Sequence, residues 1–89
     1  MYTILYTKRT KKEIENLKSA KLDGTTLKLI EVLKNNPFQN PPPYEKLTGD
    51  LKNYYSRRIN AQHRLVYQVF NDENIVKIVS LWSHYENIN

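Results

Sequence analysis

The sequence contains no cysteine, which excludes a disulfide scaffold and a zinc site built from thiolates. It also lacks long hydrophobic runs, since stretches such as "IVKIVSLW" are too short to cross a bilayer. The charges in the opening "MYTILYTKRTKK" follow a brief apolar stretch, whereas a signal peptide carries them before a longer one. We therefore expect a soluble cytoplasmic protein without a membrane segment, stabilised by packing alone.

The chain has 89 residues, of which 39% are hydrophobic. This size lies near the lower end of what folds alone, so we expect one domain over residues 1–89. The hydrophobic residues suffice for one modest core and leave few for a large pocket.

Acidic residues are in the minority: 14 Lys and Arg stand against 9 Asp and Glu, a net charge of +5. Such a balance favours an anionic partner, namely nucleic acid, an acidic protein or a membrane surface, over a merely solubilising surface. The stretch 46–64 has one acid, Asp50, and five basic residues: Lys46, Lys52, Arg57, Arg58 and Arg64. A second basic cluster, at residues 8–12, precedes Glu13 and Glu15 and is typical of a solvated helix start.

The hydrophobic spacing predicts two helices, over residues 10–20 and 25–36, separated at Asp23-Gly24, with Thr25 capping the second. Four strands are predicted, over residues 2–6, 54–59, 63–70 and 75–82. All four prolines fall in residues 37–43, which we expect to be an extended loop. The order β-α-α-β-β-β predicts an α+β fold, with two N-terminal helices on one face of a small, mostly antiparallel four-stranded sheet. The opposite face is then open, at least in part.

The turn between the second and third strands places two arginines together. If Ile59 and His63 close a three-residue turn, Arg58 lies directly opposite Arg64. Like charges in such a pair are destabilising, so the pair favours a bound anion, and guanidinium groups match phosphate oxygens well. The alternative is a shifted register in which one arginine pairs with Asp50 or Glu45.

The polar groups that could join the two arginines are Glu45, after the proline-rich stretch, and the two histidines of the sequence, His63 and His84. Taken singly, each is more often a surface residue than a catalytic one. Together with arginine they have the chemistry for metal-free RNA cleavage: a base for the 2′-OH, an acid for the departing 5′ oxygen, and cations for the phosphorane. The seven tyrosines could stack on bases, although we expect Tyr2, Tyr6 and Tyr67 in the core.

The stretch "YEKLTGDLKNYYSRRINAQHRLVYQV", followed by "SHY", resembles the Txe/YoeB family of bacterial toxins within the RelE/ParE superfamily. The resemblance is close over residues 36–85 and one of pattern only over residues 1–35. It implies the toxin of a type II toxin–antitoxin module, with a RelE-like fold. It further implies a ribosome-dependent endoribonuclease (an mRNA interferase) that cuts mRNA in the ribosomal A site without metal or organic cofactor.

The resemblance assigns a role to five residues. It implies Glu45 as general base, His84 as general acid and Arg64 as the residue that stabilises the transition-state charge. It implies that Arg58 supports the phosphate and that Tyr85 orients the substrate. We expect three further residues of the basic stretch to bind RNA or phosphate: Lys46, Lys52 and Arg57.

The sequence departs from the family at two points. "ENIN" follows Tyr85, so Glu86 adds a negative charge beside the site, and Thr48 stands where some relatives carry lysine.

The implied partners are the ribosome with its mRNA, and an acidic antitoxin of the YefM/Axe (Phd/YefM) kind. The sequence leaves a homodimer open. Two other functions remain as alternatives: a ParE-like toxin that inhibits DNA gyrase and cuts nothing, and a non-catalytic RNA-binding module.

Overall fold

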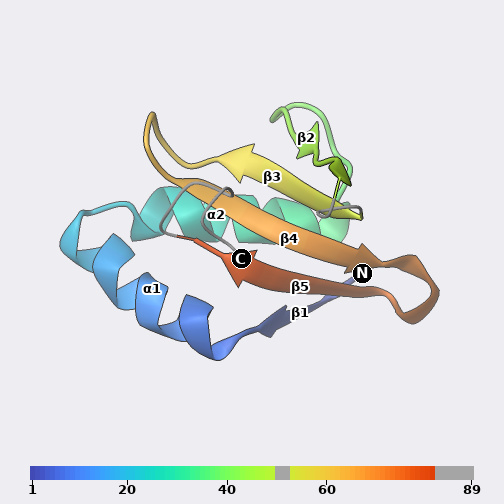
Figure 1. Cartoon of the computed structure of the whole chain (residues 1–89), viewed down its shortest axis with the longest axis horizontal. Helices are drawn as coiled ribbons and strands as arrows, with labels where there is room; N and C mark the ends of the chain where they lie inside the picture. The colour runs from blue at the N-terminus through green and yellow to red at the C-terminus, as the bar shows by residue number, and fades with distance from the viewer. Residues whose placement is uncertain (50–52, 82–89) are drawn as a thin grey trace.

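The computed structural model describes residues 1–49 and 53–81, and its elements follow the predicted order (Figure 1). Two helices are present, α1 (Lys8–Ser19) and α2 (Asp23–Asn35). The described strands are β1 (Thr3–Tyr6), β2 (Glu45–Lys46), β3 (Tyr54–Arg58), β4 (Arg64–Phe70) and β5 (Ile75–Ser80). A short 3-10 turn, η2 (Asn71–Glu73), joins β4 to β5.

The strands form one mixed sheet in the order β1-β5-β4-β3-β2. Only β1 runs parallel to its neighbour, β5, and the other pairs are antiparallel. The α+β class and the mostly antiparallel sheet are confirmed, but the predicted number of strands was too low by one. The additional strand, β2, has only two residues, and so short a segment has no alternation that a sequence pattern could reveal.

Both helices lie on one face of the sheet and enclose the core with it (Figure 1). The core residues come from both helices, from β4 and β5, and from the segments just beyond the strands: Leu17, Leu29, Ile30, Leu33, Ile59, Leu65, Tyr67, Val76, Ile78 and Leu81. Tyr67 is buried as expected, whereas the prediction for Tyr6 was wrong, because 38% of its surface is exposed at the end of β1. None of the helices in residues 1–49 and 53–81 has the length and hydrophobicity to cross a membrane.

The helix starts differ from the predicted ones. The threonine N-cap belongs to α1 and not, as predicted, to the second helix. The Thr7 hydroxyl oxygen accepts a hydrogen bond from the Thr10 amide at 3.2 Å. The helix α2 begins at Asp23 and not at Thr25, and its N-cap residue, Leu22, makes no side-chain hydrogen bond. The chain reverses at Lys21, which has a positive φ of 60°, so Asp23-Gly24 is the first turn of α2 and not the break.

Candidate functional site

The β3–β4 hairpin brings Arg58 and Arg64 together as predicted. They are direct partners in the ladder, and the turn closes through a hydrogen bond from the Ile59 amide to the His63 carbonyl at 2.9 Å. The Asn60 side-chain oxygen fixes the turn by accepting from the amides of Gln62, at 2.8 Å, and His63, at 2.7 Å. The two guanidinium groups therefore belong to the same face of the sheet, the one opposite the helices.

The short strand β2 adds a carboxylate to these cations. Glu45 is the partner of Ser56 in β3, and Ser56 is two residues from Arg58, so all three share a face. The Glu45 Oε2 atom lies 3.7 Å from Arg64 Nη1. The direct pairing of Arg58 with Arg64 is confirmed, and the alternative of a shifted register is wrong, although Arg64 does pair with Glu45 within the unshifted register.

A shallow hollow of about 220 Å³ opens between these side chains. It is lined by Pro43, Tyr44, Glu45, Ser56, Arg58 and Arg64. The Glu45 side chain is 61% exposed and that of Arg64 is 18% exposed, so the carboxylate is accessible while the guanidinium forms part of the wall. Two cations and one anion leave an excess positive charge, which favours an anionic ligand.

Ser56 is a residue of this hollow that the sequence did not single out. Its side chain is buried, and its hydroxyl oxygen has no hydrogen-bond partner among the described residues. Its pairing opposite Glu45 brings it to the site. A serine in the middle of a strand carries no signal of its own, so only the strand register could have identified it.

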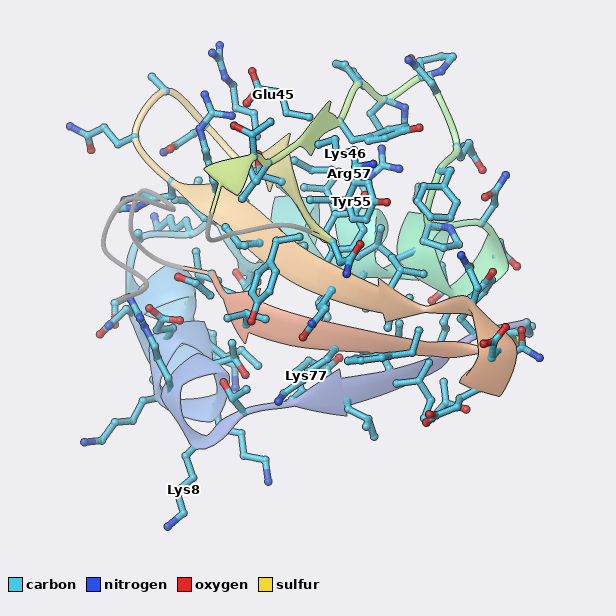
Figure 2. All side chains as sticks on the ribbon, turned by 45° about the vertical axis from the view of Figure 1, so that its right-hand side comes forward. Lys8, Glu45, Lys46, Tyr55, Arg57 and Lys77 are labelled. Atoms are coloured by element: carbon cyan, nitrogen blue, oxygen red, sulfur yellow. The ribbon has the colours of Figure 1, made fainter. Side chains whose placement is uncertain are left out.

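The remaining predicted residues have different positions. Lys46 is exposed on β2 next to Glu45 but does not line the hollow, because adjacent strand residues point to opposite faces (Figure 2). Thr48 is also exposed. Lys52, His84, Tyr85 and Glu86 lie outside the described residues. Among the residues that are described, no group of three or more His, Cys, Asp or Glu could hold a metal ion.

The prediction that Arg57 binds phosphate was wrong. Arg57 lies on the helix side of β3 and only 1% of its surface is exposed. Its Nη1 donates to the carbonyl of Pro42 at 2.5 Å, and its Nη2 donates to those of Pro37, at 3.1 Å, and Gln39, at 2.9 Å. An exposed phosphate cannot reach a guanidinium group that is enclosed in this way.

An aromatic cluster surrounds Arg57. Its guanidinium carbon lies 5.1 Å from the ring centroid of Tyr44 and 6.0 Å from that of Tyr67, and Tyr55 stacks on Tyr67 at 5.6 Å. Burial raises the pKa of Tyr67 to about 12, although the Arg57 charge opposes this shift. Tyr67 is buried and Tyr55 is partly buried against it, whereas Tyr44 is the tyrosine that lines the hollow among the described residues.

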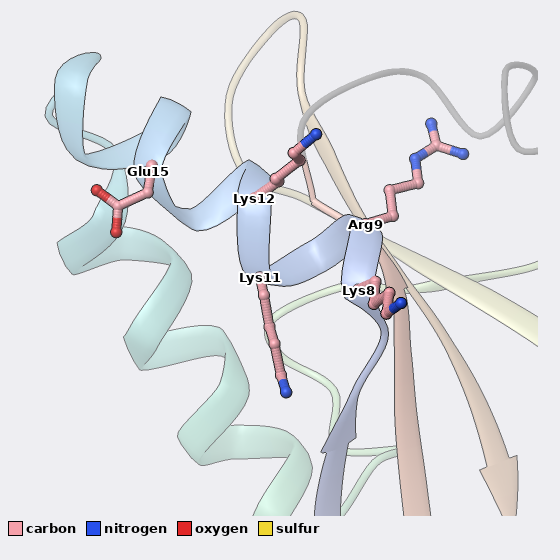
Figure 3. Close-up of a pocket in the computed structure, with 5 residues that line it drawn as sticks. All are labelled: Lys8, Arg9, Lys11, Lys12 and Glu15. Carbon is pink, nitrogen blue, oxygen red and sulfur yellow. The ribbon is translucent and has the colours of Figure 1, made fainter.

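A second hollow, of about 610 Å³, lies at the start of α1 and is lined by Lys8, Arg9, Lys11, Lys12 and Glu15. The basic side chains spread outward from the helix (Figure 3), and Lys8 and Glu45 lie at opposite edges of the sheet (Figure 2). Arg9 Nε is 3.3 Å from the buried Glu13. This surface has basic residues as predicted, and among the described residues that line it Glu15 is the one carboxylate.

Sequence comparison identifies the family of this chain. The model for the "YoeB-like toxin of bacterial type II toxin-antitoxin system" matches residues 6–85. A YoeB toxin from Synechocystis is 40% identical over 58 residues, which are 65% of each chain, so the match spans just under two thirds of that relative.

Solved structures agree with this assignment. A YoeB/ParE toxin from Agrobacterium tumefaciens is 30% identical with a TM-score of 0.84, over 96% of this chain and 100% of that one. The Staphylococcus aureus YoeB, solved in a YoeB-YefM complex and as a YoeB dimer, is 31% identical with a TM-score of 0.79. The complex match covers 96% of this chain and 99% of that one, and the dimer match 94% and 98%. This chain belongs to the family of YoeB-like toxins of bacterial type II toxin–antitoxin systems.

Proposed function

We propose that this toxin is an endoribonuclease that cuts mRNA in the A site of the ribosome and thereby inhibits translation. The observation that carries the proposal is the open hollow in which Arg58 and Arg64 face each other and Glu45 lies 3.7 Å from Arg64. This combination supplies a base and two phosphate-binding cations on one exposed surface, which is what metal-free cleavage requires.

The proposed reaction begins when the Glu45 carboxylate takes the proton of a ribose 2′-OH. The 2′ oxygen then attacks the adjacent phosphorus, and Arg64 and Arg58 stabilise the negative charge that builds up on the phosphate oxygens. His84 donates a proton to the departing 5′ oxygen, and Tyr85 orients the substrate. These last two roles rest on the resemblance of "SHY" to the family.

Dependence on the ribosome is supported by the shape of the site. A shallow hollow of about 220 Å³ offers few contacts to a flexible RNA strand. Because correct orientation of the reacting groups is a large part of the barrier, another body must hold the strand. The ribosome, in the cytoplasm, supplies that support.

We also propose an acidic antitoxin of the YefM kind as the partner that inactivates the toxin. The Staphylococcus aureus relative in a YoeB-YefM complex and the net charge of +5 support this. The dimer of the same relative supports a homodimer of the free toxin.

The test compares the purified toxin on naked mRNA and on the same mRNA bound to ribosomes, with the 5′ ends of the fragments mapped. We expect efficient cleavage at the A-site codon on ribosomes and weak cleavage of naked RNA. Equal rates would indicate a general ribonuclease. Toxicity without any cleavage would favour the ParE-like alternative, and binding without either effect would favour an RNA-binding module.

A further inference from the structure

We propose that Arg57 is a positioning residue, which fixes the proline-rich loop and through it the place of the Glu45 carboxylate. This inference rests on the proposed function for its catalytic part. The anchoring itself is a property of the free protein and is testable without RNA.

The guanidinium group of Arg57 donates hydrogen bonds to three backbone carbonyls of the loop. Pro37, Gln39 and Pro42 span most of the segment between α2 and β2, and all three accept hydrogen bonds from Arg57. The Tyr67 hydroxyl also donates to the Pro37 carbonyl, at 2.8 Å. The described loop has no strand or helix of its own, so these bonds replace the ladder that would otherwise fix it.

The energetics indicate that Arg57 serves more than stability. Its side chain is buried, its Nε has no hydrogen-bond partner, and it forms no ion pair with a carboxylate in residues 1–49 and 53–81. Burying a charge costs free energy, and apolar replacements of buried charged groups are often neutral or stabilising. What an apolar side chain cannot do is bind three carbonyls at once and so specify one conformation of the loop.

The loop conformation determines where Glu45 lies. The ring of Tyr44, the residue just before Glu45, packs on the guanidinium group at 5.1 Å. Glu45 then pairs with Ser56, the residue just before Arg57. The strand β2 has only two residues, and its described side-chain ion pair, at 3.7 Å with a largely exposed carboxylate, holds it weakly. The position of Glu45 therefore depends on its backbone, which Arg57 anchors from the opposite side of β3.

The kinetic test uses Arg57→Lys, because an ammonium group cannot reproduce a planar fork that reaches three acceptors. Because small misplacements of reacting groups lower the rate of the chemical step, we expect kcat for ribosome-bound mRNA to fall about ten- to a hundred-fold. We expect KM to change less than about two-fold. Arg57→Met removes the charge and leaves no described carboxylate without its partner. It should show the same fall in kcat with little change in KM, and it replaces Arg57→Lys if that variant does not fold.

The matched control is Ile30→Val, a core substitution in α2 that lowers stability but removes none of the hydrogen bonds from Arg57 to the loop. The assay temperature is set so that variant and control have equal folded fractions. If Ile30→Val loses as much kcat as Arg57→Lys, or if Arg57→Lys keeps the wild-type kcat, the positioning role is overturned.

Hydrogen–deuterium exchange of the free toxin tests the anchoring alone. The Leu47 amide, which donates to the Tyr54 carbonyl at 2.9 Å, reports the attachment of β2. We expect its protection to fall at least about ten-fold in Arg57→Lys, while amides of β5 keep theirs. Unchanged protection at Leu47 would overturn the inference. If the wild-type protein cuts no RNA while Arg57→Lys still loses protection at Leu47, the proposed function is refuted and the anchoring stands.

Discussion

Arg57 and Arg58 are neighbours in β3 with opposite environments, and the alternation of a strand is the reason. Arg58 is exposed beside the hollow, where it meets water and the charge of Arg64. Arg57 is enclosed by carbonyl oxygens and aromatic rings. One residue type thus lines the proposed phosphate site on one face of β3 and binds the carbonyls of the proline-rich loop on the other.

Substitution of Arg64 tests the proposed contact between this residue and the phosphate of the mRNA. Arg64→Ala removes a charged contact to the transition state, so the rate on ribosomes should fall about a hundred- to a thousand-fold with the fold retained. Arg64→Lys should also be poor, because an ammonium lacks the guanidinium fork. Lys28→Ala, on the exposed side of α2, is the control and should keep full activity. A folded Arg64→Ala protein that stops growth at the wild-type dose would contradict the assignment.

Tyr67 predicts how stability depends on pH. The pKa of its phenol is about 12 in the folded protein, against an ordinary value of 10.0. The unfolded chain therefore loses this proton first, and the free energy of unfolding should fall as pH rises from about 10 to about 12.

Tyr67→Phe removes this dependence together with the hydrogen bond to the Pro37 carbonyl. Urea unfolding at pH 8 should show the variant less stable by about 1 kcal/mol. The difference in the free energy of unfolding should shrink at pH 11. There the phenol of Tyr67 ionises in the unfolded wild type but not in the folded one, which destabilises only the wild type. A gap of equal size at both pH values would mean that Tyr67 does not titrate as described.

At the scale of elements, the helix caps give a matched pair of substitutions. Thr7→Ala removes the cap of α1 and should lower the free energy of unfolding by about 1 kcal/mol. Thr25→Ala lies in the exposed first part of α2, where alanine has the better helix propensity, so stability should stay equal or rise slightly. Urea unfolding compares the two. The reverse order would show that α2 is capped at Thr25 after all.

The hairpin and the presence of a loop at the prolines were predictable, whereas the way in which Arg57 anchors that loop was not, for physical reasons. Residues 54–70 carry β-branched and aromatic side chains around a short turn, and these local signals fix the register that pairs Arg58 with Arg64. The burial of Arg57 depends on carbonyls 15 to 20 residues away in the chain, for which no local signal exists. Charge alone favoured the surface for Arg57, and tertiary hydrogen bonds overrode it. The same non-local pairing creates β2 and brings Ser56 to the hollow.

At the scale of the whole molecule, basic residues line both the hollow beside Glu45 and the one at the start of α1. Lys46 lies next to Glu45, whereas Lys12 lies at the start of α1 (Figures 2 and 3). Lys46→Glu should weaken binding to ribosomes and reduce its salt slope by about 1. Lys12→Glu makes the same change in net charge and should leave both nearly unchanged. Equal losses would mean that total charge, and not the site, attracts the RNA.

The central claim is that the 2′-OH of the mRNA is the nucleophile and that Glu45 activates it. The most direct measurement is the chemistry of the ends produced on ribosome-bound mRNA. The account predicts upstream fragments with a 2′,3′-cyclic phosphate or its opened 3′-phosphate, and downstream fragments with a free 5′-hydroxyl, at a rate that Glu45→Gln lowers strongly. Downstream fragments with 5′-phosphates would show that the 2′-OH was not the nucleophile, and would contradict the roles given to Glu45 and His84.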